Sequence, residues 1–522
     1  MPRLPTLLLL QASRENPLLP LLLKECRSLP SARAELRWLR ERVVRDYTQP
    51  PSLADPIARM PRQGQNMRLG KELGIDADVD AESVLWKMCQ RRASGVPLQY
   101  ILGDQPFGDL EILCQRGVLI PRADTEAYTY EAARLVEQRW KESEKQRQMQ
   151  KNRNERGDKD DPTIPPGCTS SPQPLRILDL CTGTGCIALL LHALLAGSSQ
   201  APRPLQILGV DLSPTAVRLA RRNREHNVRL NGLEARAREE VEFRRGDVLK
   251  SNAKHEHAHQ QGHEHSNENG DGIENAHAQV DLGDIHTRPI KSTKITSTRT
   301  ATSNGPSSRA GNRDGHVPSV ENLLSSFFHH HPLHSTSPSP SPSTTTPTAK
   351  QESLPKIDLL ISNPPYISAS DFHNGTTARS VRLFEPRLAL VPPLLTRPHE
   401  KNPINLQKFK GLRTEPAHAQ PPDHPEDIFY RHILQLAHKV QAGITVLECG
   451  DRLQAERVVG LFRETVRKVV SSSSLDGMDE HDPGTDTDGS YAVEIWPSRE
   501  EDLCANGFHP RDGSRCVIIQ RR

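Results

Sequence analysis

The chain has 522 residues, of which 35% are hydrophobic and 4% aromatic, with 43 prolines and a formal net charge of +3. A uniformly globular protein needs more apolar surface than this to offset the conformational entropy of its chain, so we expect a folded part interrupted by long disordered insertions. The nearly neutral charge argues against a nucleic-acid coat or a polybasic membrane anchor. Nine cysteines without paired spacing indicate reduced thiols rather than a disulfide framework.

Residues 1–110 are predicted to form a small helical domain. Leucines recur at mostly helical intervals between residues 22 and 43, and a second helical pattern runs from Glu82 to a stop at Gly95. Basic residues near the start, Arg3 and Arg14 among them, fit either a mitochondrial presequence or an amphipathic helix of the folded protein, and the sequence leaves both open. Residues 107–120 alternate apolar and polar residues, which predicts a hairpin. No apolar run of the sequence reaches the length of a membrane span.

Residues 111–522 are predicted to form an α/β domain. The segments predicted as strands are 175–180, 205–212, 241–249, 357–362, 444–450, 491–499 and 514–522. The segments predicted as helices between them are 186–195, 213–227 and 427–440. Apolar strands that alternate with helices indicate a parallel sheet covered on both faces, which binds ligands beyond the carboxyl ends of its strands.

Four polar segments interrupt this domain, at about 143–173, 251–352, 397–423 and 471–490. The longest is rich in His, Asn and Gly at first and then in Ser, Thr and Pro. A segment of this length and composition is too long for an ordered loop, so we expect the insertions to be disordered. Its histidines, His255, His257 and His259 among them, allow a non-enzymatic reading as a metal-binding tract. The tract lacks fixed ligand geometry, so no metal site is expected.

The first candidate site is a glycine turn after the strand 175–180. Gly183 and Gly185 would let a ligand approach the backbone closely. Asp211, at the end of the next strand, could accept hydrogen bonds from both ribose hydroxyls of an adenosine ligand, and Asp247 could meet its adenine amino group. The pattern also fits a dinucleotide fingerprint, so by itself it does not separate a nicotinamide cofactor from S-adenosylmethionine. The candidate cofactor-binding residues are Asp179, Cys181, Thr182, Gly183, Thr184, Gly185, Asp211, Asp247 and, from the next motif, Asn363.

The second candidate site, which we predict to be catalytic, is the turn Asn363-Pro364-Pro365-Tyr366 after a buried strand. An amide or aromatic amine nitrogen has a delocalised lone pair, so it must be oriented before it can attack a methyl sulfonium. The Asn363 side-chain oxygen and the Pro364 carbonyl could accept its two N–H bonds. The prolines have no backbone N–H and a restricted φ, and Tyr366 offers a flat face to a planar group. The rate gain would come from orientation and charge placement, without a reactive Cys, a reactive Ser or a metal.

Taken together, the motifs resemble the HemK/PrmC class of protein-(glutamine-N5) methyltransferases, which modify the Gly-Gly-Gln loop of peptide-chain release factors. The matching stretches are PLQYILG (97–103), VLIPRADTE (118–126), ILDLCTGTGCIAL (177–189), GVDLSPTAVRLARRN (209–223), LLISNPPYIS (359–368) and LFEPRLAL (383–390). Weaker matches are VLECGD (446–451) and RDGSRCVII (511–519). Outside the insertions, the resemblance covers nearly the whole chain.

The resemblance implies a Rossmann-like, seven-stranded class I methyltransferase sheet behind an N-terminal helical domain that helps hold the release factor. It implies that the glycine turn, Asp211 and Asp247 bind S-adenosylmethionine, and that residues 363–366 hold the glutamine. The IPRADTE residues Arg122, Asp124 and Glu126 would order a loop near the site.

The chain departs from the family at two positions of the glycine turn. Bacterial members usually have Gly where this chain has Cys181, and Ala where it has Cys186. Cys is small, so we expect cofactor binding to survive provided that the backbone at Cys181 avoids positive φ.

The alternative function is adenine-N6 methylation of DNA or RNA, because such enzymes also use an Asn/Asp-Pro-Pro-Tyr turn. The near-neutral charge and the lack of a basic, aromatic-studded recognition domain argue against it. We therefore expect a monomer that acts on a release factor, with no direct contact to nucleic acid or membrane. The bacterial type of architecture in a chain with eukaryote-like insertions favours the mitochondrial matrix over the cytoplasm. Deletion of residues 251–352 is expected to leave methyl transfer intact.

Overall fold

The computed structural model describes residues 3–48, 80–155, 174–197, 204–250, 317–328, 354–393, 424–473, 490–497 and 515–522. All of these belong to one compact unit, composed of Met1–Ser251 and Val317–Arg522. A second unit, Asn252–His316, lies outside the described residues.

The first part of the chain forms helices, as predicted, and more of them than the two patterns in its sequence indicated. They are α1 (Thr6–Glu15), α2 (Leu19–Cys26), α3 (Leu29–Thr48), α5 (Ala81–Ala93) and α6 (Leu98–Leu102). Their apolar faces form a core of their own, in which Leu22 and Leu39 are fully buried. The Asp80 carboxylate caps α5 by accepting the Ser83 N–H at 2.6 Å, as N-terminal caps commonly do. The left-handed Gly95, at φ 98°, follows shortly after the helix ends, as predicted.

A hairpin follows the helices, slightly earlier than predicted. Strand β1 (Asp104–Phe107) pairs with β2 (Leu110–Leu113) in antiparallel register. The turn falls at Gly108, whose φ of 56° suits glycine. The rest of the segment predicted as a hairpin, up to residue 120, leads instead towards α7 (Ala123–Glu155).

All seven predicted strands form one sheet, in the order β5-β4-β3-β6-β7-β9-β8. They are β3 (Leu175–Leu180), β4 (Leu205–Asp211), β5 (Val241–Arg245), β6 (Leu359–Ser362), β7 (Ile444–Cys449), β8 (Tyr491–Trp496) and β9 (Arg515–Arg521). The sheet is parallel, as predicted, except at β9, which is antiparallel to both β7 and β8. The number and order of the strands agree with the Rossmann-like, seven-stranded sheet expected from the resemblance.

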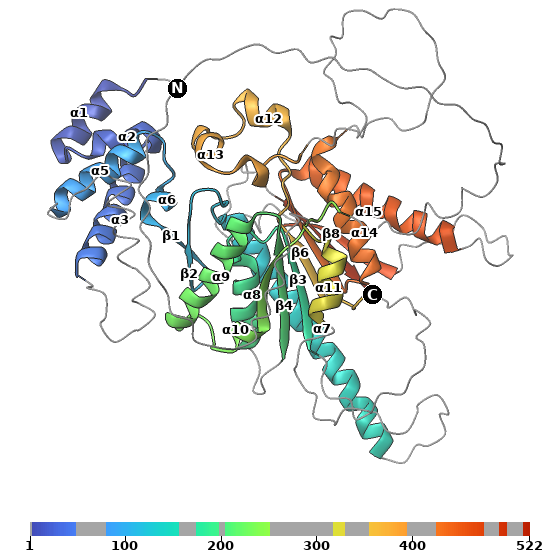
Figure 1. The fold of residues 1–522 in the computed structure, drawn as a ribbon. Coiled ribbons are helices and arrows are strands. Elements are labelled where there is room, and N and C mark those ends of the chain that lie inside the picture. The colour runs from blue at the N-terminus through green and yellow to red at the C-terminus, as the bar shows by residue number, and fades with distance from the viewer. Residues whose placement is uncertain are drawn as a thin grey trace, which may run out of the picture. The chain divides into compact units, whose positions relative to one another are not determined.

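Helices cover both faces of the sheet (Figure 1). Side chains alternate along each strand, so Ile177 joins one core and Leu178 the other. The first core contains α7, α8 (Cys186–Ala196) and α9 (Pro214–Arg229), and the second contains α11 (Val320–Phe328), α14 (Ile428–Lys439) and α15 (Arg452–Ser473). The remaining short helices are α10 (Ala237–Glu240), α12 (Ala369–Asn374), α13 (Arg379–Phe384), η1 (Arg387–Ala389) and η2 (Pro425–Asp427).

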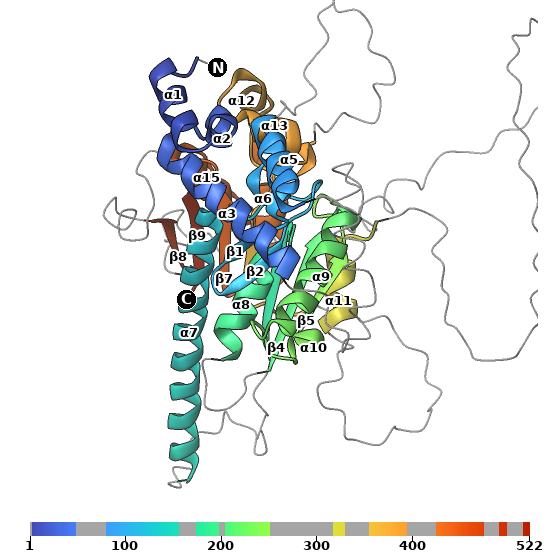
Figure 2. The ribbon, with the colours of Figure 1, turned by 90° about the vertical axis from the view of Figure 1, so that its left-hand side faces the viewer.

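In three of the four segments predicted as disordered insertions, the structure contains helical residues. Helix α7 continues to Glu155, and its residues 141–149 are all exposed where it runs clear of the sheet (Figure 2). Helix α15 extends to Ser473, and α11 lies inside the segment predicted as 251–352. The prediction of disorder is wrong for these helices. The other residues of the insertions, including the histidine tract, lie almost entirely outside the described residues.

Helix α11 shows why the low-complexity composition misled the prediction. Its buried side chains are Val320, Leu323, Leu324, Phe327 and Phe328, a spacing that places all five on one helical face. The nine-residue apolar pattern was legible in the sequence, but polar low-complexity residues surround it on both sides.

Candidate active site

The register of the sheet brings the two sequence motifs together. Leu180, the last residue of β3, pairs with Ser362, the last residue of β6, in parallel register. The Ser362 hydroxyl also donates a hydrogen bond to the Leu180 carbonyl at 2.8 Å. Cys181 and Asn363 therefore begin their turns at the same edge of the sheet, beyond the carboxyl ends of adjacent strands. The chain leaves β3 towards β4 and β5 on one side and returns to β6 on the other, so this edge is the topological switch point.

The glycine turn is a compact bend between β3 and α8. The Thr182 N–H donates to the Val210 carbonyl at 3.1 Å, and the Gly185 N–H donates to the Thr182 carbonyl at 2.8 Å. A Cβ at Gly185 would lie 2.8 Å from the Phe243 ring, so packing requires glycine there. A Cβ at Gly183 would meet only the Cys181 carbonyl oxygen, at 3.9 Å. The backbone of Gly183 thus faces open space, as a cradle for a ligand would.

The backbone at Cys181 does not avoid positive φ, which was the condition expected for cofactor binding to survive the change from Gly to Cys. Its φ is 59°, in the left-handed region that favours glycine. A non-glycine residue there costs roughly 1–2 kcal/mol, so the chain carries strain at this position of the turn. Cys186, by contrast, begins α8 and is buried, where a small side chain fits. Thr184, between them, is also buried, and its carbonyl accepts the Asn223 side-chain amide at 2.9 Å.

Three candidate acidic residues lie at or just beyond the ends of neighbouring strands. Asp179 is fully buried beneath the turn, and its carboxylate accepts the Thr182 hydroxyl at 2.5 Å. Burial raises the pKa of Asp179 to about 7, although the hydrogen bond from Thr182 opposes this rise. Asp211 is half-buried and accepts the Gly183 N–H at 2.9 Å and the Ser213 N–H at 2.8 Å. Burial also raises the pKa of Asp211, against the effect of those two bonds.

Asp247 follows β5 and links it to the segment before α11. Its backbone N–H donates to the Pro318 carbonyl at 3.0 Å, and its carboxylate accepts the Leu249 N–H at 2.9 Å. The Asp247 side chain is half-buried. The ends of β3, β4 and β5 therefore present Asp179, Asp211 and Asp247 in turn, as the strand order requires.

The Asn-Pro-Pro-Tyr turn has a rigid centre and two half-buried polar ends. Pro364 and Pro365 are buried, whereas Asn363 and Tyr366 are partly exposed. The Asn363 side-chain N–H donates to the Thr125 hydroxyl oxygen at 3.2 Å. The Tyr366 hydroxyl donates to the Glu448 carboxylate at 3.0 Å, and its ring lies against Gly450, where a Cβ would come within 3.1 Å. Asn363 is half-buried and bonds to Thr125, so its side chain does not point into the apolar core. The chemistry predicted for the turn requires this placement, because Asn363 must be able to reach a substrate.

Thr125 and Glu448 lie beside this turn and are not among the site residues predicted from the sequence. The Thr125 hydroxyl, in the first turn of α7, donates to the Glu448 carboxylate at 2.6 Å. Glu448 lies near the end of β7 and is only 2% exposed. Burial raises its pKa, and hydrogen bonds from hydroxyls, Thr125 first, oppose the rise. A carboxylate in the run ITVLEC, whose other residues are uncharged and mostly apolar, was the signal that could have indicated it, because a buried charge needs partners.

A second buried carboxylate joins the two family motifs IPRADTE and FEPRLAL. The Glu385 carboxylate accepts a hydrogen bond from the Arg122 guanidinium at 2.8 Å and another from the Ile120 N–H at 3.1 Å. Arg122 thus holds the loop before α7, in agreement with the ordering role expected from the resemblance. Asp124 and Glu126 lie in the first turn of α7, beside Thr125.

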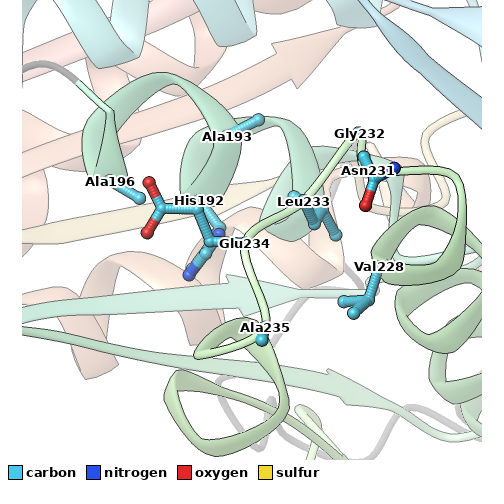
Figure 3. Close-up of a pocket in the computed structure, with 9 residues that line it drawn as sticks. All are labelled: His192, Ala193, Ala196, Val228, Asn231, Gly232, Leu233, Glu234 and Ala235. Atoms are coloured by element: carbon cyan, nitrogen blue, oxygen red, sulfur yellow. The ribbon is translucent and has the colours of Figure 1, made fainter.

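The structure also contains a cavity of about 360 Å³ at the far ends of α8 and α9 (Figure 3). The fully buried His192 lines it, with its Nε2 2.9 Å from the Glu240 carboxylate. None of the site residues predicted from the sequence lines this cavity.

Among the described residues, no helix is long and apolar enough to cross a membrane, and no group of three or more His, Cys, Asp or Glu side chains is placed to hold a metal.

Comparison with known proteins gives sequence relatives but no family model: no protein-family model matches the chain. The chain is 32% identical over 223 residues to the Saccharomyces cerevisiae protein named mitochondrial MRF1 N(5)-glutamine methyltransferase MTQ1. These aligned residues cover 43% of this chain and 49% of that protein. It is 40% identical over 135 residues to the probable MRF1 mitochondrial N(5)-glutamine methyltransferase of Schizosaccharomyces pombe, covering 26% and 32% of the two chains.

A bacterial relative gives the same result. The chain is 35% identical over 156 residues to the release factor glutamine methyltransferase of Haemophilus influenzae, covering 29% of this chain and 44% of that protein. The chain spans about half the length, or less, of the curated relatives that it matches. Within those limits, its sequence is similar to that of N5-glutamine methyltransferases named for release factors, which confirms the resemblance inferred from its motifs.

Proposed function

We propose that this chain transfers a methyl group from S-adenosylmethionine to the side-chain amide nitrogen of the glutamine in the Gly-Gly-Gln motif of a peptide-chain release factor. The observation that carries the proposal is the pairing of Leu180 with Ser362, which sets the glycine turn beside the Asn-Pro-Pro-Tyr turn. A methyl donor on one turn and an amide on the other would then meet at one edge of the sheet.

The glycine-turn side fits the methyl donor. The backbone at Gly183 is open, and each Asp211 carboxylate oxygen accepts one backbone N–H, which leaves acceptor capacity for ribose hydroxyls. Asp247 would meet the adenine end. Asp179 is fully buried, so its contribution would pass through Thr182. S-adenosylmethionine supplies an electrophilic methyl group on a sulfonium.

The Asn-Pro-Pro-Tyr side fits a planar amide. Asn363 Oδ1 and the Pro364 carbonyl would accept the two N–H bonds of the glutamine amide, turning its lone pair towards the methyl group. As the nitrogen–carbon bond forms, the carbon–sulfur bond breaks, and the nitrogen then loses one proton to water. Tyr366 would pack against the amide plane. These residues act by orientation and charge placement, so no strong base is required.

The N-terminal helices would help to bind the protein substrate. Large apolar side chains are exposed on these helices, including Trp38 on α3 and Trp86 on α5, as is common at protein interfaces. Glu25 of α2 lies 3.5 Å from Arg379 of α13, the second helix after the Asn-Pro-Pro-Tyr turn. A substrate loop at that turn would therefore pass close to the helical core.

We also propose a location in the mitochondrial matrix, since the names of the two fungal relatives refer to mitochondria. Imaging of the tagged full chain beside a matrix marker tests this proposal. A signal confined to the cytoplasm would overturn the location without affecting the proposed reaction.

The function is tested by incubating the full chain with labelled S-adenosylmethionine and either a release factor or oligonucleotides. Mass spectrometry is expected to find one added methyl group on the Gly-Gly-Gln glutamine. Asn363→Ala should lower the rate by about 10²–10³-fold, as the loss of a preorganised polar group does in other enzymes. Asn322→Ala, on the exposed face of α11, is the matched control and should be fully active. Label found only in adenine would favour the nucleic-acid alternative, and label in neither substrate would reject both.

A further inference from the structure

We propose that Glu448 and Thr125 are positioning residues that set which end of the Asn363 side-chain amide faces the substrate. The inference rests on the proposed function and deepens it. It follows from a continuous chain of hydrogen bonds that joins β7, the start of α7 and the turn after β6.

Both carboxylate oxygens of Glu448 are engaged by hydroxyl groups. Oε2 accepts the Thr125 hydroxyl at 2.6 Å, and Oε1 accepts the Tyr366 hydroxyl at 3.0 Å. Glu448 is 2% exposed, so water contributes little to its solvation. Burial raises the pKa of Glu448, and the hydrogen bonds from these hydroxyls oppose that rise. While the carboxylate is ionised it can only accept hydrogen bonds, so each hydroxyl directs its single proton towards Glu448.

Because the Thr125 hydroxyl donates its only proton to Glu448, it determines the orientation of the Asn363 side-chain amide. Once its proton is given to Glu448, the Thr125 oxygen has only lone pairs to offer, and it accepts the Asn363 Nδ2 at 3.2 Å. Asn363 Oδ1 is then the end of the amide that remains for the substrate. The two ends of an amide have nearly the same shape, so its hydrogen-bond partners must determine the orientation. A reversed amide would present N–H groups to the glutamine N–H groups and would repel the substrate.

The same carboxylate also holds the aromatic end of the turn. Tyr366 is kept between the Glu448 carboxylate and the backbone at Gly450. One buried group therefore sets both polar ends of the Asn-Pro-Pro-Tyr turn, while Pro364 and Pro365 hold its centre. A residue that merely filled space at position 448 would leave the Thr125 proton free to turn towards Asn363 Oδ1.

The test removes the hydrogen bond without changing the volume. Thr125→Val is expected to lower kcat on a release factor at least about tenfold, with the KM for S-adenosylmethionine changed by less than about twofold. Thr125→Ser keeps the hydroxyl and should retain most of the activity. Glu448→Gln should behave like Thr125→Val, because its amide can donate to Thr125. The control is Tyr430→Phe, which removes a buried hydroxyl that donates to the backbone carbonyl of Glu448 at 2.8 Å and should retain kcat.

A second measurement reports the orientation without a substrate. In protein labelled with ¹⁵N-asparagine, the Asn363 side-chain amide signal is identified by its loss in Asn363→Asp. Its protons should exchange slowly with solvent in wild type and Thr125→Ser, and faster in Thr125→Val and Glu448→Gln. Equal exchange in all four proteins, or kcat of Thr125→Val within about twofold of wild type, would overturn the inference. If wild type methylates no release factor, the proposed function fails, and the exchange measurement still decides the orientation.

Discussion

Helix α11 provides the sharpest test of the fold, since it lies in a segment that composition alone marks as disordered. Leu324 is fully buried in the core on one face of the sheet, together with Phe327. Substitution of a buried leucine by alanine costs about 2–5 kcal/mol, and the rigid sheet beneath this site can collapse little. We therefore expect Leu324→Ala to lower the free energy of unfolding by about 3–4 kcal/mol. The exposed Asn322 on the same helix gives the control Asn322→Ala, which should change it by less than about 0.5 kcal/mol.

The assay is urea unfolding of the full chain, followed by circular dichroism. Leu324→Ala should lower the midpoint while leaving the slope of the transition unchanged, because the surface exposed on unfolding is nearly the same. Equal midpoints for Leu324→Ala and wild type would show that α11 does not pack on the sheet, and the reasoning from its helical spacing would be refuted.

The packing of α11 also changes the expected effect of deletions. Removal of residues 251–352 would take α11 away with the low-complexity residues, so the expectation that activity survives that deletion no longer holds. Five apolar side chains, each worth about 1.5–3 kcal/mol when buried, would lose their place. A deletion limited to Asn252–His316, outside the compact unit that contains the sheet, should instead leave the urea midpoint unchanged. A lowered midpoint for the shorter deletion would contradict this.

Two further predictions concern β3 and β4, the strands beneath the glycine turn. Gly209→Ala should destabilise the fold by about 1–3 kcal/mol, because the new Cβ would lie 2.4 Å from the Phe243 ring. Adding Phe243→Leu to Gly209→Ala should recover part of that loss in the free energy of unfolding. If the double variant loses the sum of the two single losses, as measured by urea unfolding, the clash is contradicted. Asp179 has a pKa raised from 3.8 to about 7, so the folded state binds its proton more tightly than the unfolded chain does. Stability from this group is fully present below pH 3.8, declines by up to about 1.4 kcal/mol per pH unit and is lost by about pH 7. Thermal unfolding between pH 5 and pH 8 should show a steeper decline in wild type than in Asp179→Asn, because Asp211 and Glu448, whose pKa values burial also raises, are present in both proteins. Parallel profiles would contradict the burial argument.

The sequence by itself determined the elements whose signals are local. Largely apolar runs such as residues 175–180 and 205–211 became β3 and β4 because a strand buried on both faces favours apolar side chains at most positions. The Asn-Pro-Pro-Tyr and glycine turns followed their strands as predicted, since proline and glycine restrict or extend the backbone wherever they occur. The family resemblance rested on the same short motifs.

Only the tertiary structure decided how distant residues meet. The left-handed backbone at Cys181 is imposed by the bend between β3 and α8, and residue type alone does not reveal it. The antiparallel direction of β9 depends on its pairing with the edge of β7 that β6 leaves free, which local sequence does not specify. Thr125 and Glu448 lie 323 positions apart in the chain, and their hydrogen bond exists because α7 and β7 pack on one sheet. Short-range patterns encode strands, helices and turns, whereas the partners of a buried polar group depend on register and packing across the whole chain.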